Sequence, residues 1–237
     1  MENQFERTEK LIGGEALQKL KSSRVAVFGI GGVGGACAEA LARMGIGAID
    51  LYDNDVVTPT NINRQTVALY STIGRYKVDV MEERIMDINP ECRVTCHKVF
   101  YMPDTSESID LSCYDCIIDA IDTVTGKIEL IIRAKAAGVN IICSMGAGNR
   151  MDPTKFTVTD ISKTEMDPLA KTMRKELRSR GIKDVLVVWS KEPPSTPVIP
   201  ANEPESSPSV PRTPASNSFV PPTAGLILAA EAVKHLI

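Results

Sequence analysis

Short apolar runs and longer amphipathic segments alternate along this chain. The apolar runs predict buried strands, and they cover residues 24–28, 48–53, 93–100, 114–122, 139–144, 155–161 and 184–189. Apolar residues at helical spacing and alanine-rich stretches predict helices at residues 14–21, 34–44, 77–88, 124–137, 168–180 and 223–236. Because strands and helices alternate, we expect an α/β fold with a doubly wound, mostly parallel Rossmann-like sheet.

The regularity of this pattern changes after Asn149. We interpret residues 1–237 as a single domain, with a core at 1–148 and an extension at 149–190. Residues 191–215 are rich in proline, serine and threonine, so they cannot bury a core and are predicted to form a mobile loop. A closing strand and helix are expected over residues 216–237.

A glycine turn after the first apolar run carries the clearest chemical signal. Gly29, Gly31 and Gly34 fit the pattern G-x-G-x-x-G between a predicted strand and a predicted helix. Asp53 follows Gly34 by 19 residues, close to the usual distance for a carboxylate that holds a ribose. This context predicts nucleotide binding at the start of the helix. The alternative is a unit whose glycines serve only packing.

The amino-acid composition limits the class of protein and of partner. Of the 237 residues, 43% are hydrophobic and 24% are charged, which are ordinary globular values, and the net charge of −3 gives no global sign of nucleic-acid binding. A local basic patch on and after one predicted helix could still meet tRNA phosphates, although it could equally be a solvated helix face. The patch consists of Lys171, Arg174, Lys175, Arg178, Arg180 and Lys183.

Cysteine use and hydropathy indicate a cytoplasmic protein without membrane spans. The N-terminus is polar and charged rather than a signal peptide, so the six cysteines are expected to be free thiols in a reducing compartment. Cys113-x-x-Cys116 lacks a well-spaced second pair, which disfavours a zinc site. No apolar run has the length of a membrane span.

The polar stretch after Asp53 suits a triphosphate better than a nicotinamide. Arg64 and Lys77 supply cations that can screen phosphate oxygens, and Asp122 ends a buried strand, where a carboxylate can hold Mg²⁺. Taken singly, Lys77 could be a solvated first-turn lysine and Arg64 a member of a surface salt bridge. Their common order after the glycine turn favours ATP and Mg²⁺.

The combined motifs resemble those of the adenylating superfamily, which includes the ubiquitin-activating enzymes and the molybdopterin and thiamine adenylyltransferases. The resemblance covers about residues 7–148, which would then be the ATP-binding part of the chain. It is carried by Gly29-x-Gly31-Gly32-x-Gly34, Asp53-x-Asp55, Asn61-x-x-Arg64-Gln65, Lys77 and Asp119-x-x-Asp122.

The resemblance implies a role for each matched residue. Asp53 would hold the ribose, Asp122 would bind Mg²⁺, and Arg7 would reach into the partner's site in a homodimer. The triphosphate would be lined by Asn61, Arg64, Gln65 and Lys77. Catalysis would rest on Asp122, Arg64, Lys77 and Arg7.

One branch of the superfamily matches over nearly the whole chain. Asn89-Pro90-Glu91, Gly146-Ala-Gly148 and Asp167-Pro168-Leu169 look like those of the tRNA threonylcarbamoyladenosine dehydratases. In that branch ATP activates a carboxylate on the modified adenosine, and attack from within the modification closes a ring. Some members carry a cysteine before the last helix, where this chain has 216–222 without one.

Other functions stay open at this stage. An activator of a ubiquitin-like or sulfur-carrier protein would share the ATP site, but no cysteine follows Cys143 to form a thioester in the C-terminal segment. A nucleotide-sensing scaffold and an NAD-dependent oxidoreductase are further alternatives. Neither His97 nor His235 is well placed in the sequence for hydride chemistry. The sequence leaves open whether the intermediate is an adenylate or a phosphate, and whether a sulfur-relay protein is a partner.

Overall fold

A computed structural model of the chain describes residues 3–198 and 214–237. Seven strands of the described residues form one sheet in the order β3-β2-β1-β4-β5-β7-β6. All neighbouring strands are parallel except β6, which pairs antiparallel with β7 at one edge. The strands are β1 (Arg24–Phe28), β2 (Ala48–Tyr52), β3 (Arg93–His97), β4 (Cys116–Asp119), β5 (Asn140–Ser144), β6 (Phe156–Asp160) and β7 (Leu186–Ser190). The doubly wound, mostly parallel sheet predicted from the sequence is therefore confirmed.

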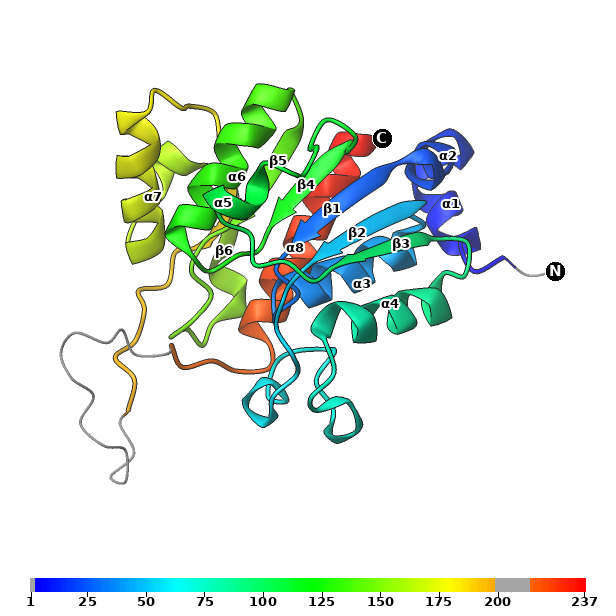
Figure 1. The fold of residues 1–237 in the computed structure, drawn as a ribbon, viewed down its shortest axis with the longest axis horizontal. Helices are drawn as coiled ribbons and strands as arrows, with labels where there is room; N and C mark the ends of the chain where they lie inside the picture. The colour runs from blue at the N-terminus through cyan, green and yellow to red at the C-terminus, as the bar shows by residue number, and fades with distance from the viewer. Residues whose placement is uncertain (1–2, 199–213) are drawn as a thin grey trace.

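Helices cover both faces of this sheet (Figure 1). One face carries α3 (Gly34–Met44), α4 (Lys77–Ile88) and α8 (Val220–Leu236). The other carries α5 (Pro103–Ser106), α6 (Val124–Ala137) and α7 (Pro168–Ser179). Two clusters of buried apolar side chains fill the two interfaces, so each face of the sheet has its own core. Helices α1 (Glu6–Ile12) and α2 (Gly14–Ser22) pack at the end of α3, beside Gly45.

The strand order changes direction between β1 and β4. The chain leaves β1 through α3 towards β2 and β3, and it later returns to place β4 on the opposite side of β1. Ligands of open α/β sheets bind at such a switch point, outside the carboxyl ends of the strands. The glycine turn after β1 and the Asp119–Asp122 turn after β4 meet there.

Several expected boundaries differ from the structure. Residues 6–12 form a helix that the polar composition of this region does not suggest, and β3 ends at His97 rather than at residue 100. The expected closing strand is wrong: the described part of the C-terminal segment holds only α8, which begins at Val220. It begins early because proline is tolerated in a first helical turn and because the Asn217 side chain accepts hydrogen bonds from the N–H of Phe219 and Val220.

Two further expectations concern the limits of the structure. The predicted mobile loop at 191–215 lies mostly outside the described residues, since the structure leaves out 199–213. Among the described residues, no helix is both long enough and apolar enough to span a membrane.

Candidate functional site

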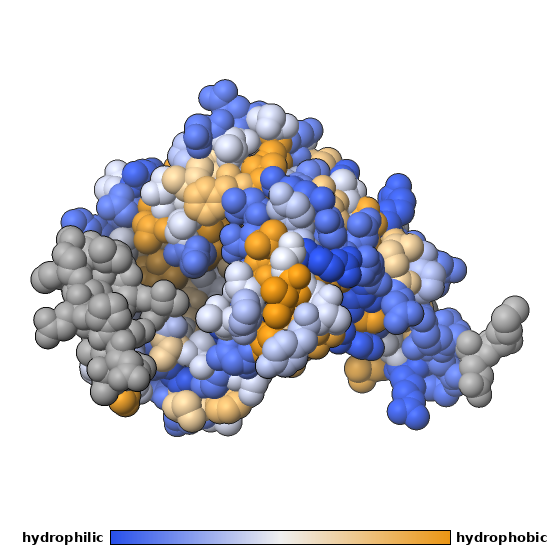
Figure 2. Space-filling model, turned by 60° about the horizontal axis from the view of Figure 1, so that its bottom comes forward, coloured by the Kyte–Doolittle hydropathy of each residue, from blue (hydrophilic) through white to orange (hydrophobic). Residues whose placement is uncertain are grey.

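A cleft of about 640 Å³ opens at the carboxyl ends of β1, β2, β4 and β5. Figure 2 brings this side of the molecule forward and shows it hollowed. Most of the residues selected from the sequence line this cleft. They are Gly29, Gly31, Gly32, Asp53, Asp55, Asn61, Arg64, Gln65, Lys77 and Asp122. Gly34 and Arg7 do not line it.

The glycine turn has the geometry that its sequence predicts. Gly29 adopts a φ of 88°, and a Cβ there would lie 2.7 Å from the Ala120 carbonyl oxygen of the β4 turn. A Cβ on Gly34 would lie 1.8 Å from the Gly29 carbonyl oxygen. Both positions therefore exclude any side chain. Gly34 acts through close packing of α3 against the turn, and only the earlier glycines face the cleft.

Asp53 holds the glycine turn through its carboxylate. Its Oδ2 accepts a hydrogen bond from the Ile30 N–H at 2.7 Å, and its Oδ1 accepts one from the Asp55 N–H at 2.8 Å. Burial raises the pKa of this carboxyl, against the opposing effect of the Lys77 ammonium. The carboxylate thus links the turn after β1 to the loop after β2, at the edge of the cleft.

Lys77 begins α4 and projects into the cleft as a buried cation. The residue is 5% exposed, and its Nζ lies 2.7 Å from Asp55 Oδ2. The side chain of Asp55 is 63% exposed, so this carboxylate is free to leave the pair. The interpretation of Lys77 as a solvated first-turn lysine is wrong, because the residue is buried and its ammonium is paired with Asp55.

The loop between β2 and α4 brings Asn61, Arg64 and Gln65 to the same wall. Asn61 accepts a hydrogen bond from the Thr58 N–H and so shapes the loop. Arg64 donates to the Thr60 carbonyl and to Asn63 Oδ1, and it forms no ion pair with any described residue. Gln65 is buried, and its Oε1 has no partner among the described residues. Arg64 and Gln65 therefore keep polar capacity for a ligand.

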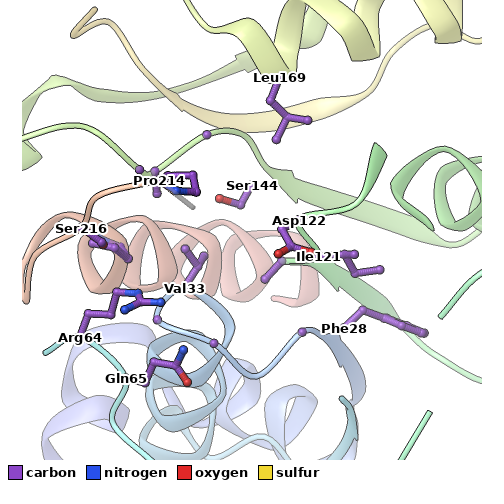
Figure 3. Close-up of a pocket in the computed structure, with 18 of the residues that line it drawn as sticks. Phe28, Val33, Arg64, Gln65, Ile121, Asp122, Ser144, Leu169, Pro214 and Ser216 are labelled. Carbon is purple, nitrogen blue, oxygen red and sulfur yellow. The ribbon is translucent and has the colours of Figure 1, made fainter. Parts of the chain in front are cut away.

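Asp122 lies on the opposite side of Val33 from Arg64 (Figure 3). It is exposed at the end of the β4 turn, whereas Asp119 in the same motif is fully buried. Asp119 Oδ1 accepts a hydrogen bond from Lys127 Nζ at 3.0 Å. The sequence did not single out Lys127, which looks like an ordinary helix lysine until its burial is known.

The far end of the cleft holds a second buried ion pair. Arg150 Nη2 lies 3.0 Å from Asp167 Oδ2, and both side chains are almost fully buried. Asp167 also accepts hydrogen bonds from the N–H groups of Gly146 and Ala170, so it caps α7 and fixes the loop after β5. The sequence marks Asp167-Pro168 only as a helix start. Arg150 carries no local signal of its role.

Aromatic rings form the wall beside the glycine turn. Phe28 stacks on Tyr52 at 4.1 Å between ring centroids, and Tyr52 stacks in turn on His97 at 4.1 Å. His97 and Tyr114 hydrogen-bond to Asp50, which is also paired with Arg24. The His97 ring is therefore held by Asp50 and Tyr52 and offers no group for hydride chemistry.

Arg7 and the basic patch lie away from this cleft. Arg7 is exposed on α1, next to Phe5, which packs against Gly45 just before β2 begins. The patch lies on and after α7, which begins at the far rim of the cleft. Within it, Arg174 is bound to the Thr164 carbonyl and Arg180 to Glu176, while Lys171, Lys175 and Arg178 are exposed.

Neither a cluster of metal-ligating side chains nor a disulfide is found in the part of the chain that the structure describes. In residues 3–198 and 214–237, no group of three or more His, Cys, Asp or Glu side chains could hold a metal ion. All six cysteines are free.

Comparison with known proteins identifies the family. The model described as the ThiF family matches residues 5–237. The chain belongs to the ThiF family. Within it, the chain is 46% identical over 246 residues to the tRNA threonylcarbamoyladenosine dehydratase of Bacillus subtilis, with 100% of this chain and 96% of that one covered.

Solved structures agree with this assignment to the ThiF family. Crystal structures of E. coli tRNA N6-threonylcarbamoyladenosine dehydratase, TcdA, in complex with AMP and with ATP match with TM-scores of 0.86 and 0.85. Their sequence identities are 39% and 38%, and each match covers 98% of this chain and 93% of that one. The family resemblance seen in the sequence is confirmed.

Proposed function

We propose that this protein is an ATP-dependent tRNA threonylcarbamoyladenosine dehydratase. The observation that carries the proposal is the convergence of Arg64, Lys77 and Asp122 on one cleft beside the glycine turn, in a chain that is 46% identical to the B. subtilis dehydratase. ATP is the cosubstrate, and the AMP and ATP complexes of TcdA support that choice. Residues 1–148 would bind the nucleotide, 149–190 would form the extension on the substrate side, and 216–237 would close the domain through α8, within one domain.

The chemistry begins with activation of a carboxylate. A carboxylate oxygen of the threonylcarbamoyl group attacks a phosphorus atom of ATP, which releases pyrophosphate if the attack is at the α-phosphorus or ADP if it is at the γ-phosphorus. A nucleophile within the same modification then attacks the acyl carbon and loses its proton, and the carboxylate oxygen departs in AMP or in inorganic phosphate, respectively. The net change in the nucleoside is the loss of one water. No covalent bond to the enzyme is needed, so neither a thiol nor a sulfur-relay partner is required.

Charge stabilisation is assigned to the cations of the cleft. Lys77 exchanges its exposed partner Asp55 for a phosphate oxygen, and Arg64 donates its unpaired N–H groups to another. Asp53 orients the glycine turn and accepts the ribose hydroxyls. Arrangement of the reacting groups before the reaction, rather than a strong acid or base, supplies the rate enhancement.

The donor set fits Mg²⁺. Asp122 offers one exposed carboxylate at the cleft, and Mg²⁺ in nucleotide sites is commonly held by one or two carboxylates, substrate phosphates and water. Asp122 would hold the ion, with Asp119 directed instead at Lys127. When bound, Mg²⁺ would neutralise charge on the phosphates.

The basic patch is assigned to the tRNA. Lys171, Lys175 and Arg178 are exposed on α7, and the Asp167 cap places the first turn of this helix at the rim of the cleft. A tRNA that reaches the cleft from this side meets these charges first, and phosphate contacts of this kind position a nucleic acid without reading its sequence.

A homodimer in the cytoplasm completes the proposal. Arg7 would act in the partner's cleft, because α1 packs at the amino ends of the strands and a five-residue strand separates it from its own cleft by roughly 16 Å. Exposed apolar side chains on the loop between β2 and α4, including Leu69 and Ile73, offer surface for the partner.

Mass spectrometry of tRNA nucleosides tests the activity. Substrate tRNA is incubated with the protein, ATP and Mg²⁺, and its nucleosides are then separated and weighed. The expected result is loss of one water from threonylcarbamoyladenosine only when ATP is present. An unchanged nucleoside in a sample that binds ATP would refute the activity.

Subunit complementation tests Arg7 separately. Arg7→Ala and Lys77→Ala variants are each expected to lose turnover. After unfolding and refolding together, mixed dimers contain one cleft with Lys77 and the partner's Arg7 intact, so turnover should return to about one quarter of the wild-type value on a binomial count of dimers. Turnover that stays absent in the mixture would show that Arg7 does not act across subunits.

A further inference from the structure

Lys127 is a fully buried cation that takes no part in the steps above. It lies in the first turn of α6, with 0% of its side chain exposed, and it does not line the cleft. Its Nζ donates to Asp119 Oδ1 at 3.0 Å and to the Ile121 carbonyl oxygen at 2.9 Å. A buried ammonium is tolerated only with such partners, so its position fixes the atoms that it contacts.

Those atoms belong to the turn that presents Asp122. Asp119 Oδ1 accepts a second hydrogen bond from the Ile121 N–H at 3.1 Å. Both the N–H and the carbonyl of Ile121 are therefore held, the first by Asp119 and the second by Lys127. Asp122 is the next residue, and its direction follows from the orientation of this peptide.

The turn after β4 also contacts the glycine turn after β1. The Ala120 N–H donates to the Phe28 carbonyl at 2.8 Å, and the Ala120 carbonyl oxygen lies 2.7 Å from the position that a Cβ of Gly29 would take. A shift of residues 119–122 would therefore change two walls of the cleft together. These are the wall that carries Asp122 and the wall that is expected to hold the phosphates.

We propose that Lys127 is a positioning residue of the reaction. By holding the Ile121 carbonyl, it sets the direction of Asp122 and the shape of the Gly29 turn, and it touches no substrate. This inference takes the identity of the reaction from the proposed function. The positioning role itself is inferred from the buried hydrogen bonds of Lys127 with Asp119 and with the Ile121 carbonyl.

Two variants separate positioning from stability. Lys127→Met removes the ammonium but leaves a buried carboxylate unpaired, so it is expected to lower both stability and turnover. Asp119→Asn/Lys127→Met removes both charges and keeps an acceptor for the Ile121 N–H, but the Ile121 carbonyl still lacks its donor. We expect the double variant to regain most of the stability lost in Lys127→Met, although the unpaired Ile121 carbonyl keeps it below wild type, while kcat stays about 100-fold below wild type.

Nucleotide binding supplies a readout that does not depend on turnover. AMP affinity, measured by calorimetry without Mg²⁺, should fall by less than about tenfold in the double variant, since Asp53, which is expected to hold the ribose, is unchanged and only the phosphate wall at the Gly29 turn is affected. Recovery of kcat along with stability would overturn the proposal. So would loss of AMP affinity in proportion to kcat, because the whole site would then have collapsed.

Arg24→Met is the matched control. Arg24 lies at the amino end of β1, and the variant removes a cation from Asp50, a carboxylate in the middle of β2 that is 1% exposed. Turnover of this variant should stay within about twofold of wild type. A wild-type protein without dehydratase activity would refute the proposed function, whereas kcat that recovers in the double variant would refute only the role of Lys127.

Discussion

Lys77 and Lys127 form similar pairs in different surroundings. Each lies in the first turn of a helix, and each binds an aspartate that follows or ends a strand of the sheet. Lys77 pairs with a carboxylate that is 63% exposed, at the wall of the cleft, whereas both members of the Lys127–Asp119 pair are sealed. An ammonium with an exposed partner can change partners when phosphates arrive. A sealed ammonium cannot, so it can act only through the backbone that it holds.

The largest expected difference between the two lysines is in stability. Lys127→Met leaves the Asp119 carboxylate buried without its cation, which typically costs about 3–5 kcal/mol. Lys77→Met should cost less than about 1 kcal/mol, because water reaches Asp55. Urea unfolding of both variants measures the difference. Equal losses for the two would show that Lys127 is not sealed in solution.

The second difference is in turnover on a folded enzyme. Lys77→Met should lower kcat by about 100- to 1000-fold at nearly unchanged stability, the usual effect of removing one group that stabilises developing charge. Lys98→Met is the control. Lys98 follows β3 and pairs with the half-exposed Asp79 of α4, the helix that Lys77 begins, but it lies outside the cleft. Normal turnover in Lys77→Met would remove Lys77 from the mechanism.

These two lysines also show what sequence can and cannot reveal. Lys77 can be recognised in the sequence because it follows the Asn61-x-x-Arg64-Gln65 motif, after a glycine turn and Asp53 that indicate a nucleotide site. Lys127 and Arg150 have no such spacing. On sequence alone each is one charged residue in a helix or a loop, and burial is decided by segments that pack over it from distant parts of the chain.

The same limit explains the boundaries that were wrong. The start of α8 depends on the side chain of Asn217. Its Oδ1 accepts a hydrogen bond from the Val220 N–H, and its Nδ2 donates one to the Arg150 carbonyl. That contact joins residues far apart in sequence. The mostly parallel sheet, by contrast, could be predicted, because strands that alternate with helices form βαβ units. The strand order and the antiparallel pairing of β6 with β7 were not predicted from the sequence.

A lysine on α7 without an ionic partner can be compared with the paired lysines in a test of tRNA binding. Lys175 is exposed and forms no ion pair with a described residue, so it is available to a phosphate. Lys175→Ala should lower the slope of log affinity against log salt by about 0.9, with a several-fold loss of affinity at low salt. Lys234→Ala on α8, where the lysine pairs with Glu231, should leave the slope unchanged. Binding of tRNA at several salt concentrations measures both. An unchanged slope in Lys175→Ala would move the tRNA away from α7.

The smallest expected effect concerns Asp50, whose pair with Arg24 is intermediate between the two lysine pairs. Asp50 is 1% exposed, but the Arg24 side chain is 38% exposed. Burial alone would raise the pKa of the Asp50 carboxyl, but hydrogen bonds from Arg24, His97 and Tyr114 outweigh it and hold the pKa below its ordinary value.

A lowered carboxyl pKa sets the sign of the pH effect. The stability that the charged Asp50 contributes is present above the pKa of the unfolded chain, near 4, and is lost as pH falls through the folded-state value. Arg24→Met should therefore be less stable than wild type at pH 7 by at most about 1 kcal/mol, after screening by solvent, and the difference should shrink below about pH 4. Urea unfolding at pH 7, 5 and 3 measures it. A difference that stays constant to pH 3 would mean that Arg24 stabilises the sheet by packing on Tyr114, where its guanidinium lies 5.0 Å from the ring, and not through the charge of Asp50.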